Sequence, residues 1–135
     1  MIQVYSYFPI EKLQSFQDVN AEIEQSFLHN PFARILLYED DNCVKGYLLY
    51  SIMYERMEVE QLYVHPNYRR RGIASALLDH LIKTAHQNQI QNISLEVRQS
   101  NNAAIALYQK FLFIQVGVRS HYYQGEDAIL MVKNL

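Results

Sequence analysis

The stretch from residue 57 to residue 98 constrains the fold more than any other part of the sequence. It begins with an apolar run, Met57–Val64, and after a polar turn it carries apolar residues at the 3.6-residue period of a helix from Gly72 to about Gln87. Residues 93–98 then alternate between apolar and polar side chains, which is typical of a half-buried strand. A strand, a helix and a strand within about forty residues predict a parallel pair with a right-handed crossover.

The other segments predict mainly antiparallel neighbours for this pair. Short connections join the apolar runs at 34–38, 44–54 and 57–64, so they predict a meander with turns at 39–42 and 55–56. Further strands are expected at 2–7, 113–119 and 127–133. One helix is expected over about 19–29 with Asp18 as its cap, and another from Ser100 or Asn101 to Phe111. The predicted class is a mixed α/β fold, with one sheet and helices on both faces.

Composition excludes several classes of protein. The chain has 135 residues, half of them hydrophobic, which favours a single domain over residues 1–135. A net charge of −2 argues against bulk electrostatic binding to nucleic acid, and no apolar run approaches about 18 residues, so no membrane span is expected. Without a secretory signal, we predict a cytoplasmic protein. The single cysteine, Cys43, excludes an internal disulfide, and the spacing of the five histidines predicts no catalytic metal.

The segment Arg69–Ala74, between the strand and the helix, suits a phosphate group. The first N–H groups of a helix have no partner within it, and no Ser, Thr or Asp stands immediately before Gly72 to cap them. Small residues at Gly72 and Ala74 let a ligand approach the backbone, and the arginines add to the positive end of the helix dipole. On spacing alone, the segment is either a pyrophosphate site or a solvated basic turn, with Asn67 capping a helix that starts earlier.

Three polar residues further along are candidates for chemistry. Glu96 lies mid-strand and faces away from Leu95 and Val97, so it is either a general base or an ordinary exposed glutamate. Tyr108 lies on the second predicted helix and either donates a proton to a leaving group or packs on the sheet. Asn101 is explained by helix capping alone, with contact to a ligand as a secondary role.

Taken together, these motifs resemble the GNAT family of N-acetyltransferases. The residues Arg70–Ala74 resemble the family signature Q/R-x-x-G-x-G/A. The stretches LEVRQSNNAAIALYQKF (95–111) and HYYQGEDAILM (121–131) resemble its RimI-like branch, whose members acetylate protein N-termini. The resemblance covers about residues 58–132. It implies the GNAT fold, in which a mostly antiparallel sheet contains one splayed parallel pair.

The resemblance also implies a site and a reaction. Acetyl-CoA is the implied donor, and its acetyl group passes directly to the acceptor without an acyl-enzyme. Glu96 is the implied general base, needed because an α-ammonium has a pKa of about 8, and Tyr108 is the implied general acid. Strand backbone near Tyr63 and Val64 is expected to stabilise the oxyanion. The residues implied in cofactor binding are Leu62, Tyr63, Val64, Arg70, Arg71, Gly72, Ile73, Ala74, Ser75 and Asn101.

One departure from the branch concerns the end of the second predicted helix. The branch usually has a Gly-Phe pair there, whereas this sequence has Leu112-Phe113. A leucine in a left-handed C-cap costs on the order of 1–2 kcal/mol, so we predict a reshaped turn.

The acceptor is the least constrained part of the prediction. The resemblance implies a protein N-terminus, such as that of a ribosomal protein, and the alternative is a small amine. A third hypothesis, a module that binds acyl-CoA without turnover, is disfavoured because Glu96 and Tyr108 are both present. Glu126 and Asp127 either attract a basic peptide or form a solvated turn.

Overall fold

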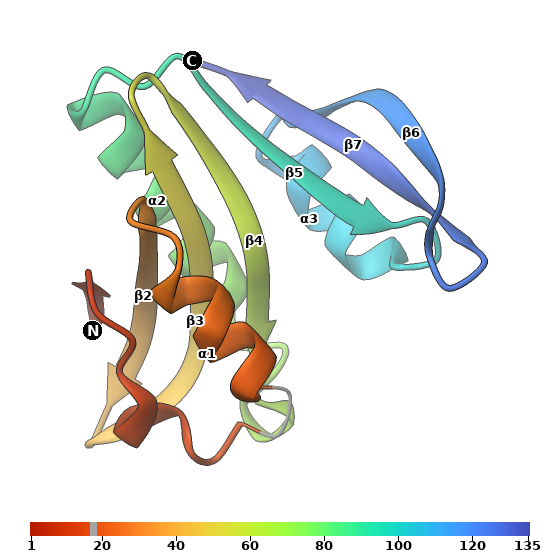
Figure 1. The fold of residues 1–135 in the computed structure, drawn as a ribbon. Coiled ribbons are helices and arrows are strands. Elements are labelled where there is room, and N and C mark those ends of the chain that lie inside the picture. Colours follow the sequence, from red (N-terminus) through yellow and green to blue (C-terminus); the bar gives the residue numbers. More distant parts are fainter. Residues whose placement is uncertain (17–18) are drawn as a thin grey trace.

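The computed structural model describes residues 1–16 and 19–135, and in this part of the chain seven strands form one sheet. The order across the sheet is β1-β2-β3-β4-β5-β7-β6 (Figure 1), and only β4 and β5 pair in parallel among the described strands. The mixed sheet predicted from the sequence is therefore confirmed. The strands are β1 (Ile2–Tyr5), β2 (Ala33–Asp40), β3 (Cys43–Met53), β4 (Arg56–Val64), β5 (Asn92–Arg98), β6 (Ile114–Tyr123) and β7 (Glu126–Asn134).

Helices cover both faces of the sheet, as predicted. On one face, α2 (Ile73–Gln87) and α3 (Asn102–Lys110) pack into a core whose centre is the fully buried leucine row of α2. On the other face, α1 (Ala21–Leu28) and the short 3-10 helix η1 (Ile10–Leu13) cover a second apolar cluster. A second 3-10 turn, η2 (Pro66–Tyr68), precedes α2. None of the helices in residues 1–16 and 19–135 has the length and hydropathy of a membrane-spanning segment.

The parallel pair is joined at one end only. β4 and β5 are in register from Arg56 opposite Asn92 to Val59 opposite Leu95, and beyond that point they diverge (Figure 1). A bulge sits where they part, because Tyr50 of β3 pairs with Val59 while its neighbour Leu49 pairs with Gln61. The extra residue bends β4 away from β5. The sheet is thereby opened at its centre, between two strands that the sequence predicted as neighbours.

Two local expectations are corrected by the structure. The cap of α1 is Asn20, whose Oδ1 accepts the Ile23 N–H at 3.0 Å, and the predicted cap, Asp18, lies outside the described residues. The turn between β3 and β4 lies at residues 54–55 rather than 55–56, since Met53 pairs with Arg56. This pairing leaves two residues to reverse the chain.

The predicted reshaping at Leu112 is wrong. Leu112 adopts the left-handed conformation with φ +69°, as the usual glycine would. Its N–H donates to the Gln109 carbonyl at 2.9 Å, and the Phe113 N–H donates to the Tyr108 carbonyl at 3.0 Å, which is the Schellman pattern. These two bonds and the burial of Phe113 hold the turn despite the strain, while the Leu112 side chain stays 73% exposed.

Replacing Leu112 with glycine should therefore stabilise the fold. Removing the Cβ relieves about 1–2 kcal/mol of left-handed strain, and the more flexible unfolded chain offsets about half of it. We expect urea denaturation to show a net gain of about 0.5–1 kcal/mol in the free energy of unfolding. Leu112→Ala is the matched control, since it trims the same side chain but keeps the Cβ. A glycine variant no more stable than the alanine variant would show that the turn is not strained.

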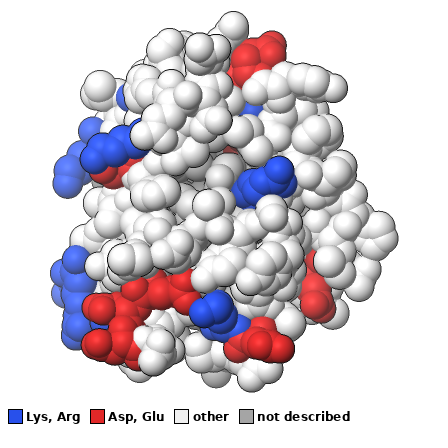
Figure 2. All heavy atoms as spheres, turned by 90° about the vertical axis from the view of Figure 1, so that its left-hand side faces the viewer, with Lys and Arg blue, Asp and Glu red and all other residues white. Residues whose placement is uncertain are grey.

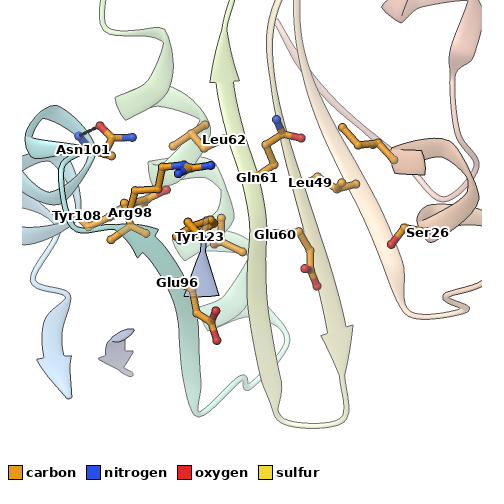
Figure 3. A pocket seen from close by; sticks show the side chains of 14 residues that line it. Ser26, Leu49, Glu60, Gln61, Leu62, Glu96, Arg98, Asn101, Tyr108 and Tyr123 are labelled. Carbon is orange, nitrogen blue, oxygen red and sulfur yellow. Dashed lines mark hydrogen bonds between the residues drawn. The ribbon is translucent and has the colours of Figure 1, made fainter. Parts of the chain in front are cut away.

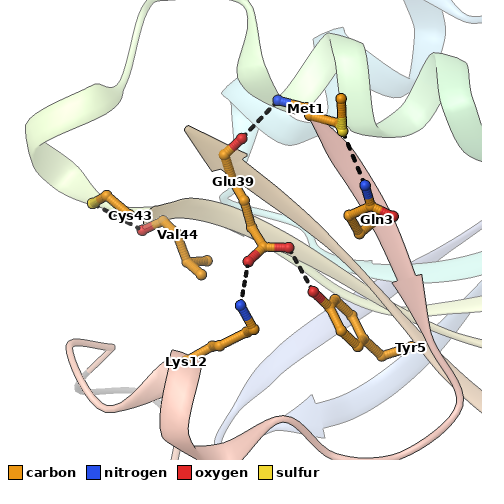
Figure 4. Close-up of polar contacts among 7 residues, drawn as sticks. All are labelled: Met1, Gln3, Tyr5, Lys12, Glu39, Cys43 and Val44. Carbon is orange, nitrogen blue, oxygen red and sulfur yellow. Dashed lines mark hydrogen bonds and ion pairs between the residues drawn. The ribbon is translucent and has the colours of Figure 1, made fainter. Parts of the chain in front are cut away.

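A polar network around Glu39 fastens β1 and η1 to β2 (Figure 4). The Glu39 carboxylate accepts the Tyr5 hydroxyl at 2.6 Å and pairs with the Lys12 ammonium at 2.7 Å, and its backbone carbonyl accepts the Met1 amino group at 2.6 Å. Burial alone raises the pKa of Glu39, but the hydrogen bonds from Lys12 and Tyr5 outweigh it and lower the pKa below the ordinary 4.5. The network thus favours the ionised carboxylate.

Glu39→Gln should lower the free energy of unfolding at pH 7 by about 1 kcal/mol. The loss is no larger because Lys12 is half exposed, so solvent screens the ion pair. A carboxylate with a lowered pKa stabilises the fold above its unfolded pKa and ceases to do so as the pH falls through the folded value. The gap between the two proteins should therefore close below about pH 4. Denaturation at several pH values measures it, with Glu55→Gln as an exposed control. A gap independent of pH would contradict this account.

Candidate active site

Where β4 leaves β5, a groove of about 540 Å³ runs along the end of β4, the loop after it and the start of α2. Nearly every residue predicted to bind the cofactor lines it, while the Arg71 guanidinium lies 5.6 Å from the Tyr68 ring centroid instead. The predicted residues brought together are Leu62, Tyr63, Val64, Arg70, Gly72, Ile73, Ala74, Ser75 and Asn101.

The start of α2 presents free backbone donors to this groove. Gly72 is the N-cap, with φ +78° and no capping side chain, and the first bond within the helix runs from the Ala76 N–H to the Gly72 carbonyl at 3.0 Å. The three N–H groups before Ala76 therefore point out of the helix end without an intrahelical partner. The alternative in which Asn67 caps an earlier start is wrong, because Asn67 belongs to η2, where its N–H donates to His65 Nδ1.

The loop ahead of α2 combines two left-handed residues with an open face and an arginine. Arg70 has φ +64°, a strained conformation for a residue with a Cβ, and Gly72 repeats the left-handed conformation two residues later. The left-handed Gly72 is followed by the right-handed Ile73, the first residue of α2, and such a pair turns successive N–H groups toward one point and forms a nest. A Cβ built on Gly72 meets nothing within 4 Å, so this side of the loop is open to a ligand. Arg70 adds its charge from the groove wall.

The backbone of β4 offers a second set of partners along the same groove. Leu62, Tyr63 and Val64 pair with β3 on one side, at Leu48, Tyr47 and Gly46. On the other side, β5 has no described residue in register with them, because the parallel ladder ends at Val59. On this side the Val64 carbonyl accepts the Arg69 Nε–H at 3.0 Å, and the rest of the edge is available to an extended ligand that adds to the sheet as a strand would.

A second groove, of about 460 Å³, opens from the same split on the α1 side of the sheet (Figure 3). It shares Leu62, Asn101, Ala104 and Tyr108 with the first groove, so the two meet at these residues. Asn101 acts as a helix cap, its Oδ1 accepting the Ala104 N–H at 3.1 Å, and also lines both grooves. Its capping and ligand roles are therefore compatible.

Glu96 reaches into the second groove from β5, as the alternation of its strand predicted (Figure 3). Leu95 and Val97 are buried in the core on the opposite face. The Glu96 carboxylate is ion-paired with the Arg119 guanidinium of β6 at 2.8 Å, and its side chain is 20% exposed. This carboxyl group on a central strand therefore lies beside a cationic partner that the sequence did not reveal.

Tyr108 lies at the junction of the grooves and is 6% exposed. Its ring packs on Phe113 with centroids 5.6 Å apart. Burial, and to a smaller extent the nearby Tyr123, raise the pKa of Tyr108 to about 12. The phenol is therefore protonated throughout the neutral range, as a proton donor must be.

Glu126 and Asp127, next to the turn between β6 and β7, both form hydrogen bonds with other residues of the protein. The Glu126 carboxylate accepts the Ser100 N–H at 2.6 Å and pairs with Arg98, and Asp127 accepts the His121 N–H at 3.0 Å. The hydrogen bond from Ser100 lowers the pKa of Glu126. These contacts fix the β6–β7 hairpin, so the structure favours the turn interpretation over attraction of a basic peptide.

In this fold the parallel strands β4 and β5 separate beside the N-terminus of α2, and the sequence also matches a known family. The sequence profile of the acetyltransferase (GNAT) family matches residues 1–113. The chain belongs to the GNAT family of acetyltransferases. The predicted family and fold are thus confirmed.

Individual GNAT proteins resemble this chain closely. The ribosomal protein bS18-alanine N-acetyltransferase of Escherichia coli (strain K12) is 32% identical over 114 residues, covering 80% of this chain and 77% of that protein. A crystal structure of the Escherichia coli enzyme has a TM-score of 0.85 at 24% identity, over 99% of this chain and 94% of that one. A GNAT acetyltransferase from Elizabethkingia anophelis, solved with acetyl-CoA bound, has a TM-score of 0.79 at 20% identity, over 99% and 98% of the two chains.

Sequence reasoning missed Glu60 and Tyr123, which line the second groove, and Arg119, which pairs with Glu96. Glu60 is at the bulge, which has no sequence signature, and the other two are brought in by the long β6–β7 hairpin. On the face in Figure 2, basic side chains lie beside acidic ones, so the described residues form no continuous basic surface there.

Proposed function

We propose that this GNAT acetyltransferase moves the acetyl group of acetyl-CoA to the α-amine of a protein N-terminus, with a ribosomal protein as the acceptor. The observation that carries the proposal is the meeting of two grooves at Leu62 and Tyr108, one with an anion nest and the other with carboxylates. The similarity to an enzyme named for acetylating the alanine of a ribosomal protein supports this class of acceptor.

The first groove fits the donor. The edge of β4 at residues 62–64, which β5 leaves unpaired, would pair with the amides of the pantetheine arm, and the N–H groups at residues 70–75 would bind the pyrophosphate. The open side of Gly72 leaves room for the phosphates. The thioester would then lie at the junction, beside Tyr108 and the side chain of Asn101.

The second groove supplies the proton chemistry. An α-ammonium must lose one proton before it attacks, and Glu96 would accept it. Backbone N–H groups near Tyr63 and Val64 would stabilise the oxyanion as the amine bonds to the carbonyl carbon. As the C–S bond breaks, Tyr108 gives its proton to the thiolate and regains one from the acylated nitrogen. The Glu96 carboxyl group then releases its proton to solvent, so every proton in the reaction is accounted for.

Intact-mass measurement of peptides after incubation with acetyl-CoA tests the proposal. Peptides that begin with Ala or Ser should gain one acetyl group, whereas the same peptides with a blocked α-amine and a free lysine should gain none. Polyamines and amino acids, assayed by release of free CoA, should react at least about tenfold more slowly. Failure to modify any free N-terminus, or faster transfer to the small amines, would contradict the protein acceptor.

A further inference from the structure

Glu60 is a second carboxylate in the proposed acceptor groove, placed there by the bulge in β4. It is the residue without a partner on β3, since Tyr50 pairs with Val59 and Leu49 with Gln61. Its side chain lines the same groove as Glu96 (Figure 3). A regular strand would have no extra residue between Val59 and Gln61. The bulge that separates β4 from β5 therefore also places this carboxylate in the groove.

The two carboxylates differ in their partners. Glu96 faces the Arg119 guanidinium at 2.8 Å. Glu60 accepts the Ser51 hydroxyl at 3.2 Å, and Ser51 in turn accepts the Asn30 amide at 2.9 Å. No cation within 4.0 Å neutralises Glu60 among the described residues, so its charge is held by uncharged groups only.

We propose that Glu60 is a second general base, which shares with Glu96 the task of taking the proton from the acceptor's ammonium. This inference rests on the proposed function. The N–H bond of the ammonium breaks, its proton passes to a Glu60 oxygen, and the neutral amine keeps the electron pair with which it attacks. The resulting carboxylic acid returns the proton to solvent after transfer, so no further reactant is needed.

The surroundings of Glu60 suit that role. The groups that face it are Ser51 on β3, Glu58 on β4 and Glu96 on β5, and its groove also holds Arg98 and Tyr123. Glu60 as a whole is exposed, but partial burial of its carboxyl group raises the pKa of Glu60, and the charges of Glu58 and Glu96 raise it further, against the hydrogen bond from Ser51. A glutamate whose pKa is raised toward the working pH is the better general base.

Steady-state kinetics of Glu60→Gln, Glu96→Gln and the double variant, with an accepted peptide, test the proposal. Each single change should lower kcat/KM by about tenfold, because the other carboxylate still accepts the proton. The double change should lower it by more than the product of the two, about 10³-fold. Glu55→Gln, an exposed position in the turn between β3 and β4 and outside the groove, is the matched control and should stay within about twofold of the parent.

Ser51→Ala provides a second test, the pH–rate profile, which would not change if Glu60 had a purely structural role. It keeps the carboxylate and removes the hydrogen bond that lowers the pKa of Glu60, so the acidic limb of the pH–rate profile should move to higher pH. If Glu60→Gln stays within twofold of its parent in both backgrounds and Ser51→Ala leaves the limb in place, the inference is wrong and the proposed function stands. An unmodified protein inactive on every peptide would overturn both.

Discussion

Replacing Tyr108 with phenylalanine is expected to lower kcat by about 10²-fold while leaving the KM for acetyl-CoA nearly unchanged. The substitution removes only the hydroxyl, and the ring keeps its packing on Phe113. With a pKa of about 12, this phenol lies about 3.5 pKa units above a thiol, so full transfer to a free thiolate is uphill by about 5 kcal/mol. Its donation is therefore coupled to the return of a proton from the acylated nitrogen and occurs as charge develops on sulfur, an interaction made in the transition state.

Tyr50→Phe is the matched control for this experiment. Tyr50 is also buried, and burial raises its pKa too, but it lines neither groove. Rapid-quench or steady-state measurement of CoA release should separate the two variants by the full 10²-fold. Equal rates for both would show that Tyr108 serves packing alone.

Replacing Gly72 with valine is expected to weaken CoA binding by about 10²-fold. Valine is strongly disfavoured at φ +78°, so the loop must leave the conformation that turns its N–H groups toward one point. Loss of two hydrogen bonds to a charged phosphate is worth about 3 kcal/mol, which is the expected difference in binding free energy. Isothermal titration with CoA measures it directly.

Gly125→Val provides an unusually close control. Gly125 has φ +83° and, like Gly72, nothing within 4 Å of a built Cβ, but it lies in the turn between β6 and β7. Both variants therefore carry the same backbone strain, and only Gly72 is part of the nest. If Gly125→Val weakened CoA binding as much, the loss at Gly72 would reflect general destabilisation.

The parts of the site that follow local rules were predictable from the sequence. Helical periodicity fixed the start of α2 near Gly72, where the absence of a capping residue indicated free N–H groups. Strict alternation along β5 placed Glu96 on the face opposite Leu95 and Val97, and buried partners confirm it. These inferences needed no knowledge of distant contacts.

The parts that were missed depend on distant contacts or on tolerated strain. The bulge at Glu60 arises from pairing between β3 and β4, and Arg119 reaches Glu96 only because β6 lies beyond β7 at the sheet edge. Leu112 was expected to avoid a left-handed turn, yet two hydrogen bonds and the burial of Phe113 hold it there. Intrinsic preference is a weak guide where tertiary contacts outweigh about 1 kcal/mol.

Backbone amide NMR during titration with acetyl-CoA tests the central claim most directly. If the split between β4 and β5 is the donor site, the largest shifts should fall on the N–H groups of residues 62–64 and 70–75, with smaller shifts at Asn101. Saturable binding with its largest shifts elsewhere, or no binding at all, would contradict the assignment of this groove.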